Sequence, residues 1–144
     1  MIKRYGDAPI TGQKYKLRPG AYAILPRDGK VLVTYQAAPH EEFQLPGGGI
    51  DPGEGPIAAL HREVYEETGF RIGSPRKLGV FRRFVFMPDY DMFAEKVCHI
   101  YLARPILPLG PPTEPGHMAV WLDPVVALAE LSNDGDADFL AGVF

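Results

Sequence analysis

A glycine-rich run followed by an amphipathic stretch, together residues 46–70, constrains the fold more than any other part of this sequence. The run Pro46–Gly49 holds three consecutive glycines, which lose much backbone entropy on ordering, and its proline lacks an N–H donor. We therefore expect this run to be a loop rather than a regular element. A second turn is predicted at Asp51–Gly53, where proline and glycine follow aspartate.

Residues 56–68 are expected to form a helix that packs through one face. Pro56 suits the first helical turn, and acidic Glu54 stands just ahead of it, where the helix dipole favours negative charge. Gly69 suits the left-handed conformation that commonly ends a helix. The apolar groups that recur at helical spacing are Ile57, Leu60, Val64 and the methyl group of Thr68.

Three carboxylates are spaced three and four positions apart on this helix, at Glu63, Glu66 and Glu67. The spacing predicts one shared face, displaced from the apolar stripe, on which each like-charge pair costs roughly 0.2–0.5 kcal/mol. A solvated acidic face is one interpretation. Clustered carboxylates beside a flexible backbone also suit a hard cation such as Mg²⁺. The preceding glycines favour this second interpretation.

The order of fixed residues in this stretch resembles the signature of the Nudix family. That signature reads Gly, five residues, Glu, seven residues, Arg-Glu, an apolar residue, any residue, Glu-Glu, any residue, Gly and an apolar residue. The residues that carry the resemblance are Gly48, Glu54, Arg62, Glu63, Val64, Glu66, Glu67, Gly69 and Phe70. The resemblance implies an α/β fold, the Nudix-type α/β/α sandwich, in which a mixed β-sheet lies between helices.

The rest of the chain reads as a mixed α/β pattern, and a single domain is expected over residues 1–144, with a basic N-terminal arm over 1–18 and a C-terminal tail over 132–144. Strands are expected over 21–25, 31–35, 43–45, 77–86, 96–103 and 119–122. The expected connections are a tight hairpin turn at Asp28–Gly29, a turn over 87–91, a proline-rich loop over 105–116 and a turn over 132–136. A helix capped by Asp123 and a short docked helix within 137–144 complete the pattern.

The resemblance implies hydrolysis of a nucleoside diphosphate that is linked to a further group, with Mg²⁺ or Mn²⁺ as cofactor. The residues that match metal ligands of the family are Glu63, Glu66 and Glu67, with the carbonyl group of Gly47 as an additional ligand. Arg62 matches the residue that holds the neighbouring glutamates, because a guanidinium group can grip carboxylates bidentately. The candidate catalytic residues are Arg62, Glu63, Glu66 and Glu114.

The general base and the substrate contacts lie partly outside the motif. Glu114, in the proline-rich loop, is the candidate base by resemblance, with a surface glutamate as the alternative reading; Glu95 is the second candidate. Gly48 would let backbone approach the site closely. Glu54 would act on bound water or a second metal ion. Arg82 is the candidate phosphate contact, although only one member of the Arg82-Arg83 pair can face a cleft, because adjacent strand residues point in opposite directions.

Composition narrows the classes of function. The net charge of −3 argues against a general nucleic-acid-binding surface. Cys98 is the single cysteine, so an intramolecular disulfide is impossible, and its apolar neighbours predict a buried small side chain. Apolar segments of membrane-spanning length, a signal peptide, a phosphate-loop motif and a zinc HExxH pair are all missing from the sequence. We therefore expect a cytoplasmic protein without membrane contact.

Three functions stay open at this point. The first is a metal-dependent pyrophosphohydrolase that acts on a small nucleotide, such as a nucleoside triphosphate, a dinucleoside polyphosphate or a nucleotide sugar. The second is a Nudix domain that binds a nucleotide without turnover, and the third is a pyrophosphohydrolase of RNA 5′ ends, which the acidic balance makes less attractive. The expected partner is a small-molecule nucleotide, and a homodimer is left open.

Overall fold

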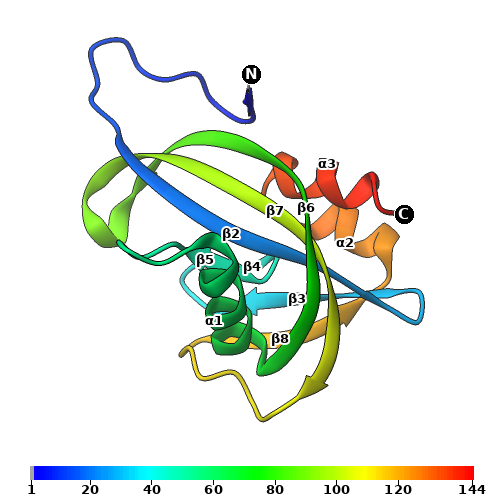
Figure 1. The fold of residues 1–144 in the computed structure, drawn as a ribbon. Coiled ribbons are helices and arrows are strands. Elements are labelled where there is room, and N and C mark those ends of the chain that lie inside the picture. The colour runs from blue at the N-terminus through cyan, green and yellow to red at the C-terminus, as the bar shows by residue number, and fades with distance from the viewer. Residues whose placement is uncertain (1) are drawn as a thin grey trace.

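Eight strands form one mixed sheet with three α-helices packed against it in the computed structural model, which describes residues 2–144 (Figure 1). The strands are β1 (Lys3–Arg4), β2 (Lys16–Arg27), β3 (Lys30–Gln36), β4 (Glu42–Gln44), β5 (Gly47–Gly49), β6 (Phe70–Met87), β7 (Met92–Pro108) and β8 (His117–Leu122). The helices are α1 (Pro56–Thr68), α2 (Pro124–Glu130) and α3 (Asp134–Ala141), with a short 3₁₀ turn η1 (Pro88–Tyr90) between β6 and β7.

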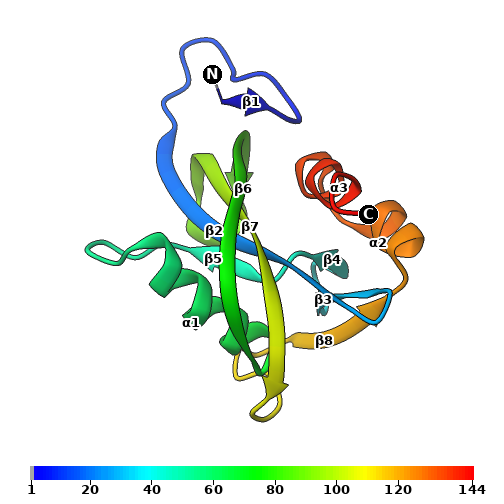
Figure 2. The same ribbon diagram turned by 45° about the vertical axis from the view of Figure 1, so that its right-hand side comes forward.

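The strand order in the sheet is β1-β6-β7-β2-β3-β4, while β5 pairs with β2 and β8 pairs with β3. The pairs β1–β6 and β2–β7 are parallel, and the other pairs are antiparallel. Figure 2 shows α1 on one side of the central strands and α2 and α3 on the other. The predicted α/β architecture, a mixed sheet between helices, is therefore confirmed.

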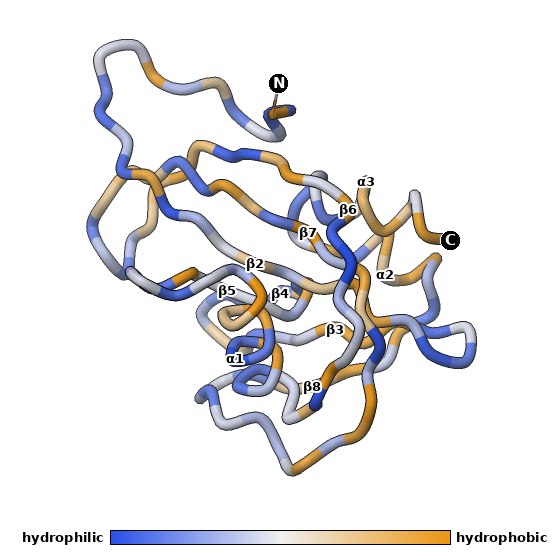
Figure 3. Tube along the Cα trace, in the orientation of Figure 1, coloured by the Kyte–Doolittle hydropathy of each residue, from blue (hydrophilic) through white to orange (hydrophobic). Residues whose placement is uncertain are grey.

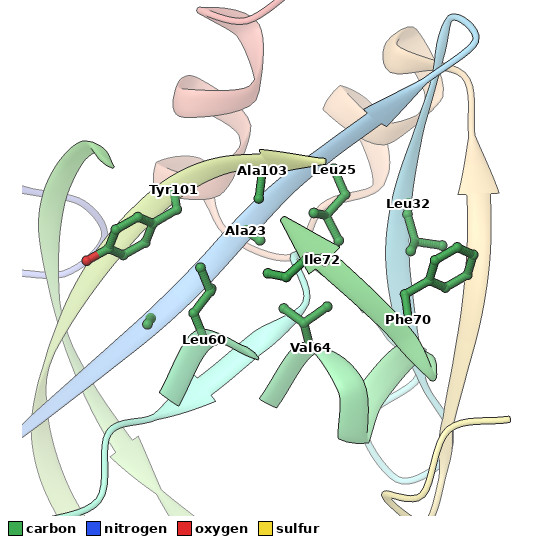
Figure 4. Packing of buried hydrophobic residues seen from close by; sticks show 10 residues of the cluster. Ala23, Leu25, Leu32, Leu60, Val64, Phe70, Ile72, Tyr101 and Ala103 are labelled. Atoms are coloured by element: carbon green, nitrogen blue, oxygen red, sulfur yellow. The ribbon is translucent and has the colours of Figure 1, made fainter. Parts of the chain in front are cut away.

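Strand β2 runs through the centre of the molecule and contributes to a hydrophobic core on each face. Successive strand residues point to opposite faces, so Ala21, Ala23 and Leu25 pack toward α1, whereas Ile24 packs toward α2 and α3. Figure 4 shows the first core, into which Leu60 and Val64 of α1 project. The second core includes Phe81, Cys98, Ile100 and Leu140. Cys98 is buried and free, as predicted.

Helix α1 begins at Pro56 and ends at Thr68, where Gly69 adopts the left-handed conformation with φ of 75°. Both limits agree with the prediction. The buried residues are Ala59, Leu60, Val64, Glu67 and Thr68. The predicted apolar stripe was wrong at Ile57, which is 40% exposed. At the first turn of the helix Ala59 takes the buried position instead.

The prediction that Pro46–Gly49 cannot be a regular element is wrong. Gly47–Gly49 form β5, which pairs antiparallel with residues 20–22 of β2. The strand lies so close to β2 that a Cβ atom on Gly47 would overlap the carbonyl oxygen of Ala21. Gly47 also has a backbone φ of 148°, which residues that carry a side chain rarely adopt. Gly47 is therefore needed for close approach between two strands rather than for flexibility.

Several boundaries also differ from the sequence-based prediction. Strands β6 and β7 extend well beyond 77–86 and 96–103 because they pair with each other along their length. The predicted loop 105–116 begins only after Pro108; Pro105 sits inside β7 beside a register shift, which accommodates its missing N–H. The predicted turn 132–136 is wrong in part, since α3 begins at Asp134. Residues 16–18, predicted to lie in the N-terminal arm, belong to β2.

Two local predictions have different outcomes. The hairpin turn between β2 and β3 is confirmed, because Asp28 and Gly29 both have positive φ, as a type I′ turn requires. Figure 3 shows this turn as a hydrophilic tip. Asp123 does precede α2, but its carboxylate accepts a hydrogen bond from Lys30 at 2.8 Å and caps no helical N–H. Among residues 2–144, no helix combines the length and the apolar character that a membrane crossing requires.

Candidate functional site

A cavity of about 500 Å³ opens between strand β5, which we call the glycine strand, helix α1, the loop after β7 and the outer parts of β6 and β7. The acidic cluster, which we define as Glu63, Glu66, Glu67 and Glu114, reaches this cavity through Glu67 and Glu114. Another part of the cavity boundary is the strand wall, which we define as Arg83 on β6, Lys96 and Cys98 on β7, and Asp136 on the neighbouring helix α3. Glu67, Glu114 and all residues of the strand wall line the cavity directly.

The acidic cluster brings together carboxylates from α1 and from the loop between β7 and β8. Oxygen atoms of Glu63, Glu66 and Glu114 lie within 4.8 Å of one another. The loop is held in place because the N–H groups of Thr113 and Glu114 both donate to the carbonyl oxygen of Glu66, each at 2.8 Å. Glu114, predicted from the sequence as a candidate base, thus lies beside the glutamates of the helix.

Arg62 organises the carboxylates around it. Its guanidinium group donates to both oxygens of Glu54 at 2.9 Å, to Glu63 at 2.9 Å, to the carbonyl oxygen of Gly49 at 3.1 Å and to Glu66 at 3.4 Å. The hydrogen bonds from Arg62 lower the pKa of Glu54 to about 2. In turn, the pKa of Arg62 is raised, mainly by its hydrogen bond with Glu54. These contacts connect Arg62 to three glutamates and to the backbone of Gly49.

Glu63 lies directly against the glycine strand. A Cβ atom on Gly48 would overlap the Glu63 carboxylate, so only glycine leaves that carboxylate its position. The Glu63 side chain is 14% exposed. Burial raises its pKa, and the hydrogen bond from Arg62 opposes that rise. Glycine at position 48 is therefore a requirement of the acidic cluster.

Glu67 differs from the other two helix carboxylates. The sequence predicted that it shares their face, but it is buried, with only 7% of the residue exposed. It is covered by Thr34 of β3 and His117 of β8, which contact it from outside the helix. Its Oε1 atom accepts a hydrogen bond from the Gly47 N–H at 3.0 Å, and its Oε2 atom lies 3.7 Å from Nε2 of His117. Burial raises the pKa of Glu67 to about 8, and the neighbouring carboxylates add to the rise.

The structure places Arg83, and not Arg82, in the cavity. Arg82 points to the opposite face of β6, where its Nη1 atom lies 3.4 Å from the carboxylate of Glu95 on β7. This corrects the prediction of Arg82 as the phosphate contact, and Glu95, the second candidate base, faces away from the site with it. Arg83 lines the cavity beside its register partner Lys96. The alternation of strand residues allowed one of the two arginines to face the cleft.

Sequence reasoning missed three residues of the site: His117, Lys96 and Asp136. Asp136 lies in the first turn of α3 and is 4% exposed. Its carboxylate accepts a hydrogen bond from Nδ2 of Asn133 at 2.9 Å, and burial raises its pKa to about 6. The sequence predicted a turn at this position, and a turn gives no signal that an aspartate will be buried.

The donor set of the acidic cluster fits a hard divalent cation. All of its donors are carboxylate oxygens, which Mg²⁺ and Mn²⁺ prefer, and three of the four carboxylates converge within 4.8 Å. Sulfur and imidazole, which favour zinc and other softer cations, do not belong to the converging group.

Comparison with known proteins agrees with this geometry. The profile of the NUDIX domain matches residues 15–143. The chain therefore belongs to the Nudix family. Among solved structures, it resembles a NUDIX hydrolase from Nitrosomonas europaea, with a TM-score of 0.73, 19% identity and coverage of 89% of this chain and 88% of that one. It also resembles a MutT NUDIX hydrolase from Burkholderia pseudomallei, with a TM-score of 0.68, 25% identity and coverage of 90% and 99%.

Curated relatives match a shorter segment. A putative 8-oxo-dGTP diphosphatase of Bacillus subtilis is 32% identical over 74 residues, which cover 51% of this chain and 50% of that protein. An RNA pyrophosphohydrolase of Aeromonas hydrophila is 46% identical over 62 residues, which cover 43% and 34%. The chain thus spans half or less of the length of these relatives.

Proposed function

We propose that this protein hydrolyses a pyrophosphate bond in a nucleoside diphosphate linked to a further group, with Mg²⁺ or Mn²⁺ as cofactor. The observation that supports this most directly is the convergence of Glu63, Glu66 and Glu114 at the edge of a cavity. A divalent cation, when bound there, supplies the positive charge that offsets the phosphate oxygens of the substrate.

The roles we propose for the residues follow from their positions. Glu63, Glu66 and Glu67, with the carbonyl group of Gly47, would hold the cation. Glu114, which is exposed on its loop, would accept the proton of the attacking water. Arg62 keeps the helix carboxylates in one arrangement through its hydrogen bonds to Glu54, Glu63 and Glu66.

The remainder of the substrate would lie along the strand wall. A cavity of about 500 Å³ falls in the range of roughly 300–1,000 Å³ that small-molecule sites occupy. Arg83 and Lys96 are register partners on neighbouring strands and both line the cavity, so they present two positive charges side by side. We propose that they contact an anionic or strongly polar part of the nucleotide, in place of Arg82.

Two other functions serve as alternatives. Hydrolysis at RNA 5′ ends is favoured by the relatives named RNA pyrophosphohydrolase, although a net charge of −3 offers little attraction for RNA. A sensor that binds without turnover is disfavoured because every carboxylate of the Nudix signature is present. The cytoplasmic location stays a prediction.

A panel of nucleotides incubated with Mg²⁺, with identification of the products, tests the proposal. The panel begins with dGTP and its 8-oxo form, which the name of the Bacillus subtilis relative suggests, and adds a dinucleoside polyphosphate, a nucleotide sugar and a 5′-triphosphorylated RNA. We expect pyrophosphate or monophosphate release that Glu63→Gln lowers by about 10²–10³-fold. The matched control is Glu130→Gln, at an exposed position on α2. Binding of nucleotides without release of any product would overturn the enzymatic proposal and favour a sensor.

A further inference from the structure

A buried chain of polar groups connects the acidic cluster to the strands behind it. His117 is the first residue of β8 and pairs with Gln36 of β3. Its side chain is 5% exposed, and Thr34, also on β3, is fully buried. Nδ1 of His117 lies 2.8 Å from the Thr34 hydroxyl oxygen, and Nε2 lies 3.7 Å from Oε2 of Glu67. The roles proposed so far use neither Thr34 nor His117.

The distances indicate which nitrogen of His117 carries the proton. The Thr34 hydroxyl lies 2.8 Å from the imidazole Nδ1 atom and 3.4 Å from the carbonyl oxygen of Glu67. Either group could donate across the 2.8 Å contact, but donation by Nδ1 would leave the lone pair of Nε2 facing an acceptor oxygen of Glu67. Donation by the hydroxyl to Nδ1 avoids this arrangement of two acceptors. A neutral imidazole has one donor and one acceptor nitrogen. Nε2 therefore carries the N–H, and it faces the Glu67 carboxylate.

Each oxygen of the Glu67 carboxylate thus faces a donor from a different element. Oε1 accepts from the Gly47 N–H on β5, and Oε2 faces Nε2 of His117 on β8. His117 also ends the loop that carries Glu114, since its own N–H donates to the Glu114 carbonyl oxygen at 3.4 Å. His117 therefore faces the buried Glu67 carboxylate through its imidazole and contacts the loop that carries Glu114 through its backbone N–H.

We propose that His117, oriented by Thr34, is a positioning residue that fixes the Glu67 carboxylate for binding of a divalent cation. This inference rests on the proposed function for the role of the cation, but it can be tested without substrate. Groups that orient the ligands of a metal site typically change metal affinity by about 10–100-fold when they are replaced.

Binding of Mn²⁺ to the protein prepared without metal, measured by electron paramagnetic resonance of the free ion, tests the proposal. His117→Leu fills a similar volume but removes the donor, and we expect it to weaken Mn²⁺ binding by about 10–100-fold. His117→Gln retains a terminal amide donor and should recover much of the affinity. The matched control is His61→Leu, at an exposed position on α1, which should bind Mn²⁺ as the unsubstituted protein does. Equal Mn²⁺ affinity in His117→Leu and the unsubstituted protein would overturn the proposal.

A second measurement keeps the proposal testable if His117→Leu fails to fold. The ¹⁵N chemical shifts of the imidazole report the tautomer directly, and we expect the proton on Nε2 in the metal-free protein at a pH well above 8, where the Glu67 carboxyl group is ionised. Thr34→Val removes the hydroxyl donor with little change in shape, so it should shift protons toward Nδ1 and weaken Mn²⁺ binding in parallel. An Nδ1–H tautomer in the unsubstituted protein would contradict the proposal.

The two proposals fail in distinguishable ways. Absence of hydrolysis with every nucleotide would overturn the proposed function and leave the Mn²⁺ and tautomer results standing. Unchanged Mn²⁺ affinity in the His117 and Thr34 variants, in a protein that hydrolyses nucleotides, would overturn only the positioning role. Where hydrolysis is found, His117→Leu should lower kcat more than His117→Gln does at saturating substrate.

Discussion

The acidic cluster and the strand wall each contain a buried carboxylate, but the two carboxylates have opposite surroundings. Glu67 is 7% exposed and is surrounded by Glu63, Glu66 and Glu114, which raise its pKa further after burial has raised it. Asp136 is 4% exposed, and the hydrogen bond from Asn133, followed by the positive charges of Arg83 and Lys96, opposes the effect of burial on its pKa. The pKa of Glu67 therefore reaches about 8, whereas that of Asp136 reaches about 6.

This difference separates what each region is suited to bind. A bound cation would relieve the repulsion among these carboxylates, so the acidic cluster is suited to bind a metal ion. The strand wall already balances its aspartate with two cations, and the surplus charge is positive. The cavity thus has one boundary that favours a metal ion and another that favours an anionic or polar group of a ligand.

Gly48→Ala should produce the largest effect and act on the acidic cluster alone. The three atoms nearest to the added methyl group all belong to the Glu63 carboxylate, and none is a backbone atom. We therefore expect the carboxylate to be displaced while the fold is retained. We expect a loss of about 10²–10³-fold in kcat/KM, because small displacements of catalytic groups are costly. Gly49→Ala is the matched control, since its Cβ atom would meet nothing within 4 Å. Similar activity in the two variants would contradict a fixed position for Glu63.

The stability of the metal-free protein should fall as the pH rises from about 5 to about 8. Glu67 and Asp136 have raised pKa values, so the folded state keeps protons that the unfolded chain releases in this window. Stability is therefore highest below the unfolded pKa values and is lost up to about pH 8, and these two groups together account for roughly 5 kcal/mol between pH 5 and pH 8. The lowered pKa of Glu54 acts in the opposite sense, but only in more acidic solution. Burial also lowers the pKa of His99 and His117, and these two groups oppose the loss of stability up to about pH 6.5.

Urea unfolding at a series of pH values measures this effect. Glu67→Gln cannot ionise at position 67 and should flatten most of the profile, whereas Asp136→Asn should remove only its lower part. Added Mg²⁺ should also flatten the profile in the unsubstituted protein. If stability instead increases over this window, the two buried carboxylates do not have the surroundings that the comparison assigns to them.

The acidic cluster could be predicted from the sequence to the extent that it is local. Glu63 and Glu66 lie on one turn of one helix, and Arg62 next to them reaches both, so helical spacing alone brings the three together. The burial of Glu67 could not be predicted in this way. It depends on Thr34 and His117, which reach the helix from two other strands.

The strand wall and the glycine strand show why other predictions failed. Pro46–Gly49 carries no local signal for a strand, because its partner is the distant strand β2. Arg82 and Arg83 alternate in direction, but which of them faces the cavity depends on Phe81, which packs into the second core and sets the phase of β6. Whether a segment forms a helix or a strand follows from its local sequence pattern. Where a strand ends, and which of its residues face the cavity, depends on its pairing with other strands.

Removal of a positive charge from the strand wall should weaken substrate binding and leave the chemical step nearly unchanged. We expect Arg83→Gln and Lys96→Gln each to raise KM by about 10-fold, which corresponds to about 1.4 kcal/mol, with kcat retained. Arg82→Gln is the matched control because it lies next to Arg83 but faces away from the cavity. A higher KM in Arg82→Gln alone would restore the prediction made from the sequence. An equal loss of kcat would show that the wall also contributes to the chemistry.

Asn133→Ala should have the smallest effect, and it tests how the strand wall is held. The Asn133 side chain caps α3 by accepting the Asp136 N–H at 2.8 Å, and it also donates to the Asp136 carboxylate at 2.9 Å. Loss of the cap should lower the free energy of unfolding by about 1 kcal/mol, as measured by urea unfolding. Asn133→Asp retains the capping acceptor but places two carboxylates together, so it should be less stable near pH 8 than near pH 5. If KM rises in Asn133→Ala as far as in Lys96→Gln, the cap holds Asp136 for the ligand; an unchanged KM would mean that its role is confined to α3.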